Sequence, residues 1–82
     1  MTRYFLDLTN SLNHTDERGH EYASLHDARA EAVRYAGQLL LGETETLVAG
    51  HDLRVNVTDE NNEVLFSVRV HTVLHPQRTP PA

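Results

Sequence analysis

The chain has 82 residues, no cysteine and a formal net charge of −5, with 12 acidic residues against seven basic ones. This length allows one domain with a small core, and the lack of cysteine excludes disulfides, thiol nucleophiles and thiolate metal sites. The acidic balance argues against nucleic-acid binding, which needs clustered basic residues. The longest apolar run, Leu39–Leu41, is too short to span a membrane. Since the N-terminus has no signal-peptide pattern, we expect a cytoplasmic protein.

Alternating apolar and polar residues predict a first strand over residues 3–9. Its inward residues are Tyr4, Leu6 and Leu8, and its outward residues are Phe5 and Asp7. Residues 10–19 are polar and rich in turn formers, which predicts a loop. Residues 19–23 predict a short second strand with Tyr22 facing inward.

A helix is predicted to begin after Ser24, because Ser24 and Asp27 form a capping-box pattern. Its apolar residues at helical spacing are Leu25, Ala28, Ala32, Tyr35, Ala36 and Leu39. Gly37 weakens a helix by about 1 kcal/mol relative to Ala unless something packs against it. Gly42 has the residue type expected just after a helix end. Residues 43–49 are ambiguous, and an irregular extension of the helix up to Gly50 is one interpretation.

The C-terminal half predicts an antiparallel hairpin. Residues 52–58 and 64–70 each alternate apolar and polar side chains, and the turn cluster Asp59–Glu63 separates them. The inward residues are Leu53, Val55 and Val57 on the first strand and Val64, Phe66, Val68 and Val70 on the second. Residues 75–82 contain three prolines without periodicity, which predicts a disordered tail after a single domain of residues 1–74.

Together these elements predict an α+β domain of order β-β-α-β-β, in which one helix packs on one face of an antiparallel sheet. A single helix leaves the other face of the sheet uncovered. That face is polar but includes two apolar side chains, and a small domain gains stability from association. We therefore expect it, or an edge strand, to contact a second copy or a protein partner through Phe5, Asp7, Arg54, Leu65 and Arg69.

Six histidines in so short a chain raise the possibility of a metal site. His14, His20 and His26 follow one another at intervals of six residues, and they could converge with Asp16 or Glu17 on a metal or another ligand. Nothing in this spacing enforces convergence, and solvent-exposed surface histidines are the preferred explanation of the pattern. Our main interpretation therefore includes no cofactor, and this histidine region remains an alternative ligand site.

Three arginines are predicted on the uncovered face. A row formed by Arg3, Arg54 and Arg69 beside Phe5 could contact nucleic acid by charge and stacking. The net charge and the position of Asp7 in the same face favour cross-strand ion pairs instead. We accordingly expect no nucleic-acid partner.

Four sequence pieces occur in an order that resembles a family of short bacterial proteins catalogued only as a domain of unknown function. The pieces are Arg3-Tyr4-Phe5, Asp16-Glu17-Arg18-Gly19-His20-Glu21, Ala28-Arg29-Ala30-Glu31-Ala32 and Val57-Thr58-Asp59-Glu60. The resemblance covers residues 3–70 and implies the same architecture without any activity. Leu6 and Asp7 stand where that family tends to have Phe and His. A fainter similarity, to small antitoxin domains of the HicB type, lacks their Pro-Gly-Cys-type loop.

The sequence thus predicts a non-catalytic interaction module that self-associates. No serine–histidine–aspartate arrangement, phosphate-binding glycine loop or cysteine nucleophile is recognisable. The alternatives are a metal- or ligand-binding accessory protein that uses His14, Asp16 and His20, and an antitoxin-like regulator.

Overall fold

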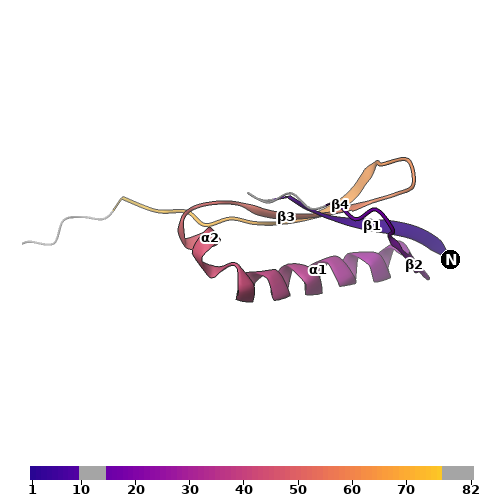
Figure 1. The fold of residues 1–82 in the computed structure, drawn as a ribbon, viewed down its shortest axis with the longest axis horizontal. Coiled ribbons are helices and arrows are strands. Elements are labelled where there is room, and N and C mark those ends of the chain that lie inside the picture. Colours follow the sequence, from indigo (N-terminus) through magenta and orange to yellow (C-terminus); the bar gives the residue numbers. More distant parts are fainter. Residues whose placement is uncertain (10–14, 77–82) are drawn as a thin grey trace, which may run out of the picture.

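The computed structural model describes residues 1–9 and 15–76 and confirms the β-β-α-β-β order (Figure 1). Strands β1 (Thr2–Thr9), β2 (His20–Tyr22), β3 (Leu53–Thr58) and β4 (Val64–Val70) form one sheet. The strand order is β2-β1-β3-β4, and every neighbouring pair is antiparallel. Helix α1 (Leu25–Gly42) lies along one face of this sheet, and the short helix α2 (Thr44–Val48) follows it. The predicted α+β class is therefore confirmed.

Helix α1 begins as the capping pattern predicts. The Ser24 hydroxyl oxygen accepts a hydrogen bond from the backbone N–H of Asp27 at 3.2 Å. Ala28, Ala32 and Ala36 form the stripe that faces the sheet, and all three are buried. Because alanine is small, the helix backbone approaches the strands closely along this stripe.

Helix α1 ends one residue later than predicted. Gly42 is its last residue, and the backbone N–H of Glu43 donates to the Leu39 carbonyl oxygen at 2.8 Å. In this region the glycine with a positive φ is instead Gly50, at φ +93°. Residues 44–48 form α2, which buries Leu47. The ambiguous segment is therefore a second, short helix that precedes Gly50.

Gly37 is exposed on α1, and a Cβ added there would meet no atom within 4 Å beyond the helix's own backbone. The glycine therefore weakens the helix without allowing a close contact. We expect Gly37→Ala to raise the free energy of unfolding by about 0.5–1 kcal/mol, since alanine restricts the unfolded chain and favours helix. Urea unfolding of both proteins at equal concentration measures this change. A less stable variant would contradict the prediction.

The core lies between α1 and the central strands. The buried hydrophobic residues are Leu8, Ala28, Ala32, Ala36, Leu47, Leu53, Val55 and Val57. Partly buried side chains pack around them, namely Tyr4, Leu6, Tyr22, Leu25, Tyr35, Leu39, Phe66, Val68 and Val70. The residues that alternation predicted to face inward on β1 and β3 all belong to this core or pack against it.

The turn between β3 and β4 is organised by Asp59. Its Oδ1 accepts hydrogen bonds from the backbone N–H groups of Asn61 at 2.9 Å and Glu63 at 3.0 Å. The β3–β4 register shifts at the turn, so that Thr58 pairs with Val64 and Leu65 is the extra residue. The predicted hairpin is confirmed, with a bulge that the alternation did not reveal.

After β4, residues 71–76 form no helix or strand. The Thr72 hydroxyl donates to the Leu47 carbonyl oxygen at 2.6 Å and so connects this segment to α2. The disordered tail predicted for residues 75–82 lies mostly outside the described residues. Within the described part of the chain, no helix is long and apolar enough to cross a membrane.

Candidate functional site

The sheet face opposite α1 carries the predicted interaction residues in cross-strand rows. Asp7 pairs with Asn56, which in turn pairs with Ser67, and Arg54 lies directly opposite Arg69. The Ser67 hydroxyl donates to Asn56 Oδ1 at 2.7 Å across one of these rows. The register therefore brings Asp7, Arg54 and Arg69 onto one face from three different strands, whereas Leu65 is the extra residue of the β4 bulge.

The loop before β2 occupies part of this face beside Phe5 and Asp7. The backbone N–H of Asp16 donates to Asp7 Oδ1 at 3.0 Å. Gly19 is buried, and a Cβ added to it would lie 2.9 Å from the Phe5 ring. Phe5 and Asp7 are consequently only partly exposed. This half of the predicted interaction face already has an intramolecular partner.

The arginines of this face do not pair with Asp7 as predicted, although one of the predicted cross-strand ion pairs forms, between Arg69 and the acidic residue two positions before Arg54. Arg69 forms an exposed ion pair with Asp52, with its Nε 3.0 Å from Oδ2. The hydrogen bond from Arg69 holds the pKa of the Asp52 carboxyl below its usual value. Arg3 donates instead to the carbonyl oxygen of Arg18. The reason is local, since Asp7 is already bonded to the loop.

Strand β4 forms one edge of the sheet. Among the described strands it pairs with β3 alone, and its other side is free. Val64 and Leu65 are exposed apolar residues on this strand. Beside it, Val33 of α1 is 54% exposed, and the Arg29 guanidinium lies 5.9 Å from the Phe66 ring centroid. This edge therefore combines free backbone hydrogen-bonding groups with apolar surface.

Asp16 anchors the loop between β1 and β2. Its Oδ2 accepts from the backbone N–H of Leu6 at 3.3 Å, and its Oδ1 accepts from those of Arg18 at 3.2 Å and Gly19 at 3.0 Å. Burial raises the pKa of the Asp16 carboxyl, but these hydrogen bonds and His20 lower it more, so the pKa lies below its usual value. Asp16 thus acts as an ionised structural acceptor.

The alternative metal site includes one residue outside the described ranges and two within them. His14 lies outside the described residues, and the Asp16 carboxylate is hydrogen-bonded to backbone groups. His20, on β2, lines the same cavity as Asp16. In the described ranges, no group of three or more histidine and acidic side chains is placed to hold a metal ion.

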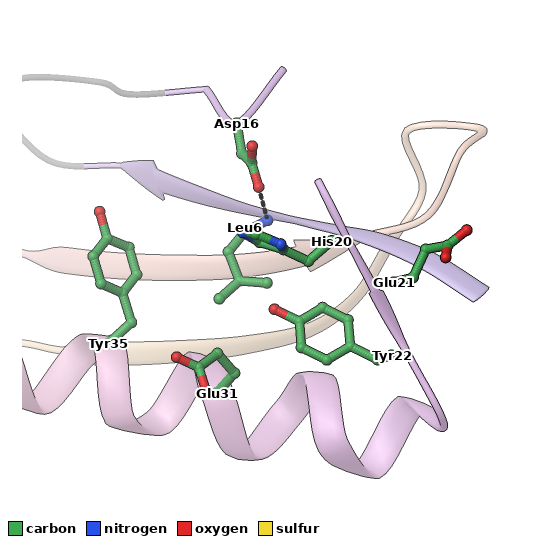
Figure 2. A pocket seen from close by; sticks show the side chains of 7 residues that line it. All are labelled: Leu6, Asp16, His20, Glu21, Tyr22, Glu31 and Tyr35. Carbon is green, nitrogen blue, oxygen red and sulfur yellow. Dashed lines mark hydrogen bonds between the residues drawn. The ribbon is translucent and has the colours of Figure 1, made fainter. Parts of the chain in front are cut away.

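A cavity of about 530 Å³ opens between α1 and the edge formed by β1 and β2. It is lined by Leu6, Asp16, His20, Glu21, Tyr22, Glu31 and Tyr35. In Figure 2 the Tyr22 and Tyr35 rings lie on either side of Leu6, Glu31 approaches from α1, and Glu21 points away. Sequence reasoning identified Asp16 and His20 but missed the two tyrosines and Glu31. The available signal was the spacing of four between Glu31 and Tyr35, which places both on one side of a helix.

The geometry defines a small α+β domain with one helical layer, a free strand edge and a cavity at the opposite edge. Residues 3–71 match the family model described as "Domain of unknown function (DUF6894)", and the chain belongs to this family. The comparisons with curated proteins and with solved structures found no match. The resemblance to a family of unknown function is thereby confirmed.

Proposed function

We propose that the protein is a non-catalytic interaction module that self-associates through antiparallel pairing of β4 with β4 of a second copy. The observation that carries the proposal is the free edge of this seven-residue strand. An exposed edge presents unpaired N–H and C=O groups that readily pair with another strand, and lysine and proline are the usual residues that prevent this. Strand β4 contains neither, and its bulge lies near the start of the strand, at Leu65, so that residues 66–70 keep a regular edge.

The pattern of β4 suits pairing with itself. A two-fold axis through Ser67, perpendicular to the sheet, places Phe66 opposite Val68 of the second copy. Side chains that face α1 in one copy then lie on the same side of the joined sheet as those that face α1 in the other. The side chains that pack against the core, Phe66, Val68 and Val70, would then extend across both copies. On the other face, Leu65 would lie opposite Arg69 of the second copy. No like charges meet directly in this arrangement.

The edge is a better candidate than the uncovered face as a whole. Phe5 and Asp7 contact the loop that contains Asp16 and Gly19, which reduces the surface available there. Leu65 and Arg69 belong to both the face and the β4 edge, so these two predicted residues remain in the proposed interface. Pairing would also cover apolar surface around Phe66 and Val33, which a small domain gains from burying.

The test exploits the position of Leu65 opposite Arg69 of the second copy. Leu65→Arg would place like charges across the interface twice, whereas Leu65→Glu would place opposite charges there. Because a cross-strand charge pair contributes about 0.2–1 kcal/mol in either direction, we expect the dimer of Leu65→Arg to dissociate about 10- to 30-fold more readily than that of Leu65→Glu. Sedimentation equilibrium over a concentration series measures both constants.

The two variants are matched controls, since each removes the same apolar side chain and differs in charge sign. Leu65 is 39% exposed, so neither change opens the core, and circular dichroism verifies folding. A wild-type protein that stays monomeric over the whole series would contradict self-association. Equal weakening by the two substitutions would contradict the β4 register.

A further inference from the structure

We propose that the cavity between α1 and the β1–β2 edge binds a small organic cation, an amine with an attached apolar group. The cavity lies at the opposite edge of the sheet from β4, so this inference is independent of the proposed self-association. Its volume of about 530 Å³ falls in the range of about 300–1,000 Å³ that is typical of small-molecule sites.

The walls of the cavity suit an apolar group. Leu6 extends from β1 toward the helix, between the rings of Tyr22 and Tyr35 (Figure 2). Both tyrosines are partly buried and pack against the core, which holds their rings in place. Within the part of the chain that the structure describes, neither hydroxyl forms a hydrogen bond. Two rings and an aliphatic side chain thus offer contact surface with polar groups at its margin.

The charges of the cavity favour a cation. Three carboxylates line it, whereas no arginine does and the chain has no lysine. Burial raises the pKa of the Tyr22 hydroxyl, and the negative charges of Glu31 and Asp16 raise it further, against a smaller effect of Arg34. The electrostatic potential at the Tyr22 hydroxyl is therefore negative. An ammonium group gains from such a potential and from the faces of aromatic rings.

Glu31 is the carboxylate that can turn toward a ligand. It forms an ion pair with Arg34 at 2.9 Å, in which its side chain is 45% exposed. Exposed pairs of this kind are weak, so a ligand ammonium group can compete for the carboxylate. Asp16 contributes its charge while its oxygens bind backbone N–H groups, and Glu21 points outward. An amine therefore fits better than a bare metal ion, which needs several convergent oxygen ligands.

The test compares three probes of similar shape on the full chain, 2-phenylethylammonium, 2-phenylethanol and phenylacetate, at constant ionic strength. Amide signals in ¹⁵N-labelled protein report where each probe binds. We expect the ammonium probe to shift the signals of Leu6, Tyr22 and Tyr35, and to bind about fivefold more tightly than the alcohol. Phenylacetate should bind more weakly than either.

Glu31→Gln tests the assigned carboxylate, and Glu45→Gln is its control, because it removes the same charge from an exposed position on α2. We expect Glu31→Gln to weaken binding of the ammonium probe about threefold, and Glu45→Gln to leave it unchanged. Equal binding of alcohol and amine, equal effects of the two substitutions, or shifts confined to other residues would each overturn the proposal. The Leu65→Arg variant should bind the probe like the wild type, which separates this result from the proposed self-association.

Discussion

Replacing Gly19 with Ala is expected to lower the free energy of unfolding by about 2–4 kcal/mol. Gly19 has φ +68°, a left-handed conformation that alanine adopts only with strain. The added Cβ would also lie 2.7 Å from the Tyr4 carbonyl oxygen and 2.9 Å from the Phe5 ring. The carbonyl belongs to the backbone of β1, so it cannot move without disturbing the pairing of that strand.

Gly50→Ala is the matched control for this experiment. Gly50 also has a positive φ, of +93°, but a Cβ there would meet no atom within 4 Å. Its replacement with Ala should therefore lower the free energy of unfolding only by the backbone strain, about 1–2 kcal/mol. Urea unfolding of all three proteins at one concentration separates the two contributions. Equal destabilisation by the two substitutions would mean that the close approach of Gly19 to β1 contributes nothing.

Asp16→Ala is expected to lower the free energy of unfolding by about 2–3 kcal/mol at neutral pH. The substitution removes the acceptor for the backbone N–H groups of Leu6, Arg18 and Gly19. Strand β2 pairs only with residues 2–4 of β1 and does not reach Leu6. The Asp16 carboxylate therefore accepts the hydrogen bond of the Leu6 backbone N–H in place of a strand partner. Thermal and urea unfolding measure the loss.

The effect of Asp16→Ala should depend on pH. The pKa of Asp16 is lower in the folded protein than its ordinary value, which is about 3.9 in an unfolded chain. At a pH between these two pKa values, the unfolded state binds more protons than the folded state. The stabilisation by Asp16 is therefore complete above the pKa of the unfolded state, and it is lost as the pH falls through the pKa of the folded state. The stability difference between wild type and Asp16→Ala should therefore shrink in acid. A difference that stays constant down to the lowest pH at which both fold would contradict this mechanism.

Glu17→Ala is the control for Asp16→Ala, because it removes a carboxylate from the next, exposed position of the same loop. Its side chain accepts no hydrogen bond from the described residues. We expect a change within about 0.5 kcal/mol, as for most surface substitutions. A loss similar to that of Asp16→Ala would indicate that the net charge of the loop matters more than the hydrogen bonds of one carboxylate.

The elements that sequence reasoning predicted well are those with a local physical signal. Alternation of period two predicted β1, β3 and β4, since a strand directs successive side chains to opposite faces. The Ser24 cap predicted the start of α1, because the hydroxyl oxygen needs only the backbone N–H three residues further on as its hydrogen-bond donor. The end of α1 was less accurate, since Gly42 continues the helix and the left-handed glycine is Gly50.

The candidate sites were predicted only in part, because alternation reports local side-chain direction and not contacts between distant segments. Alternation placed Phe5, Asp7, Arg54, Leu65 and Arg69 on one face. The register aligns Asp7, Arg54 and Arg69 in cross-strand rows there, whereas Leu65 is the extra residue of the β4 bulge. It did not reveal that the Asp16 loop would contact Phe5 and Asp7, because that contact depends on where β2 pairs. Nor did it reveal the cavity, because Tyr22 and Tyr35 line a common cavity only when β2 and α1 pack against β1.

The sequence by itself thus determined the size and charge of this protein, the β-β-α-β-β order and the side chains that β1 and β3 direct inward. These properties follow from composition, periodicity and capping, which act over a few residues. On β4, Val64 was predicted to face inward but is 54% exposed beyond the bulge. Only the tertiary structure decided that β4 is a sheet edge, that Asp16 substitutes for a strand partner and that two tyrosines flank a cavity. Each of these depends on strand order and register, which arise from contacts between residues far apart in the chain.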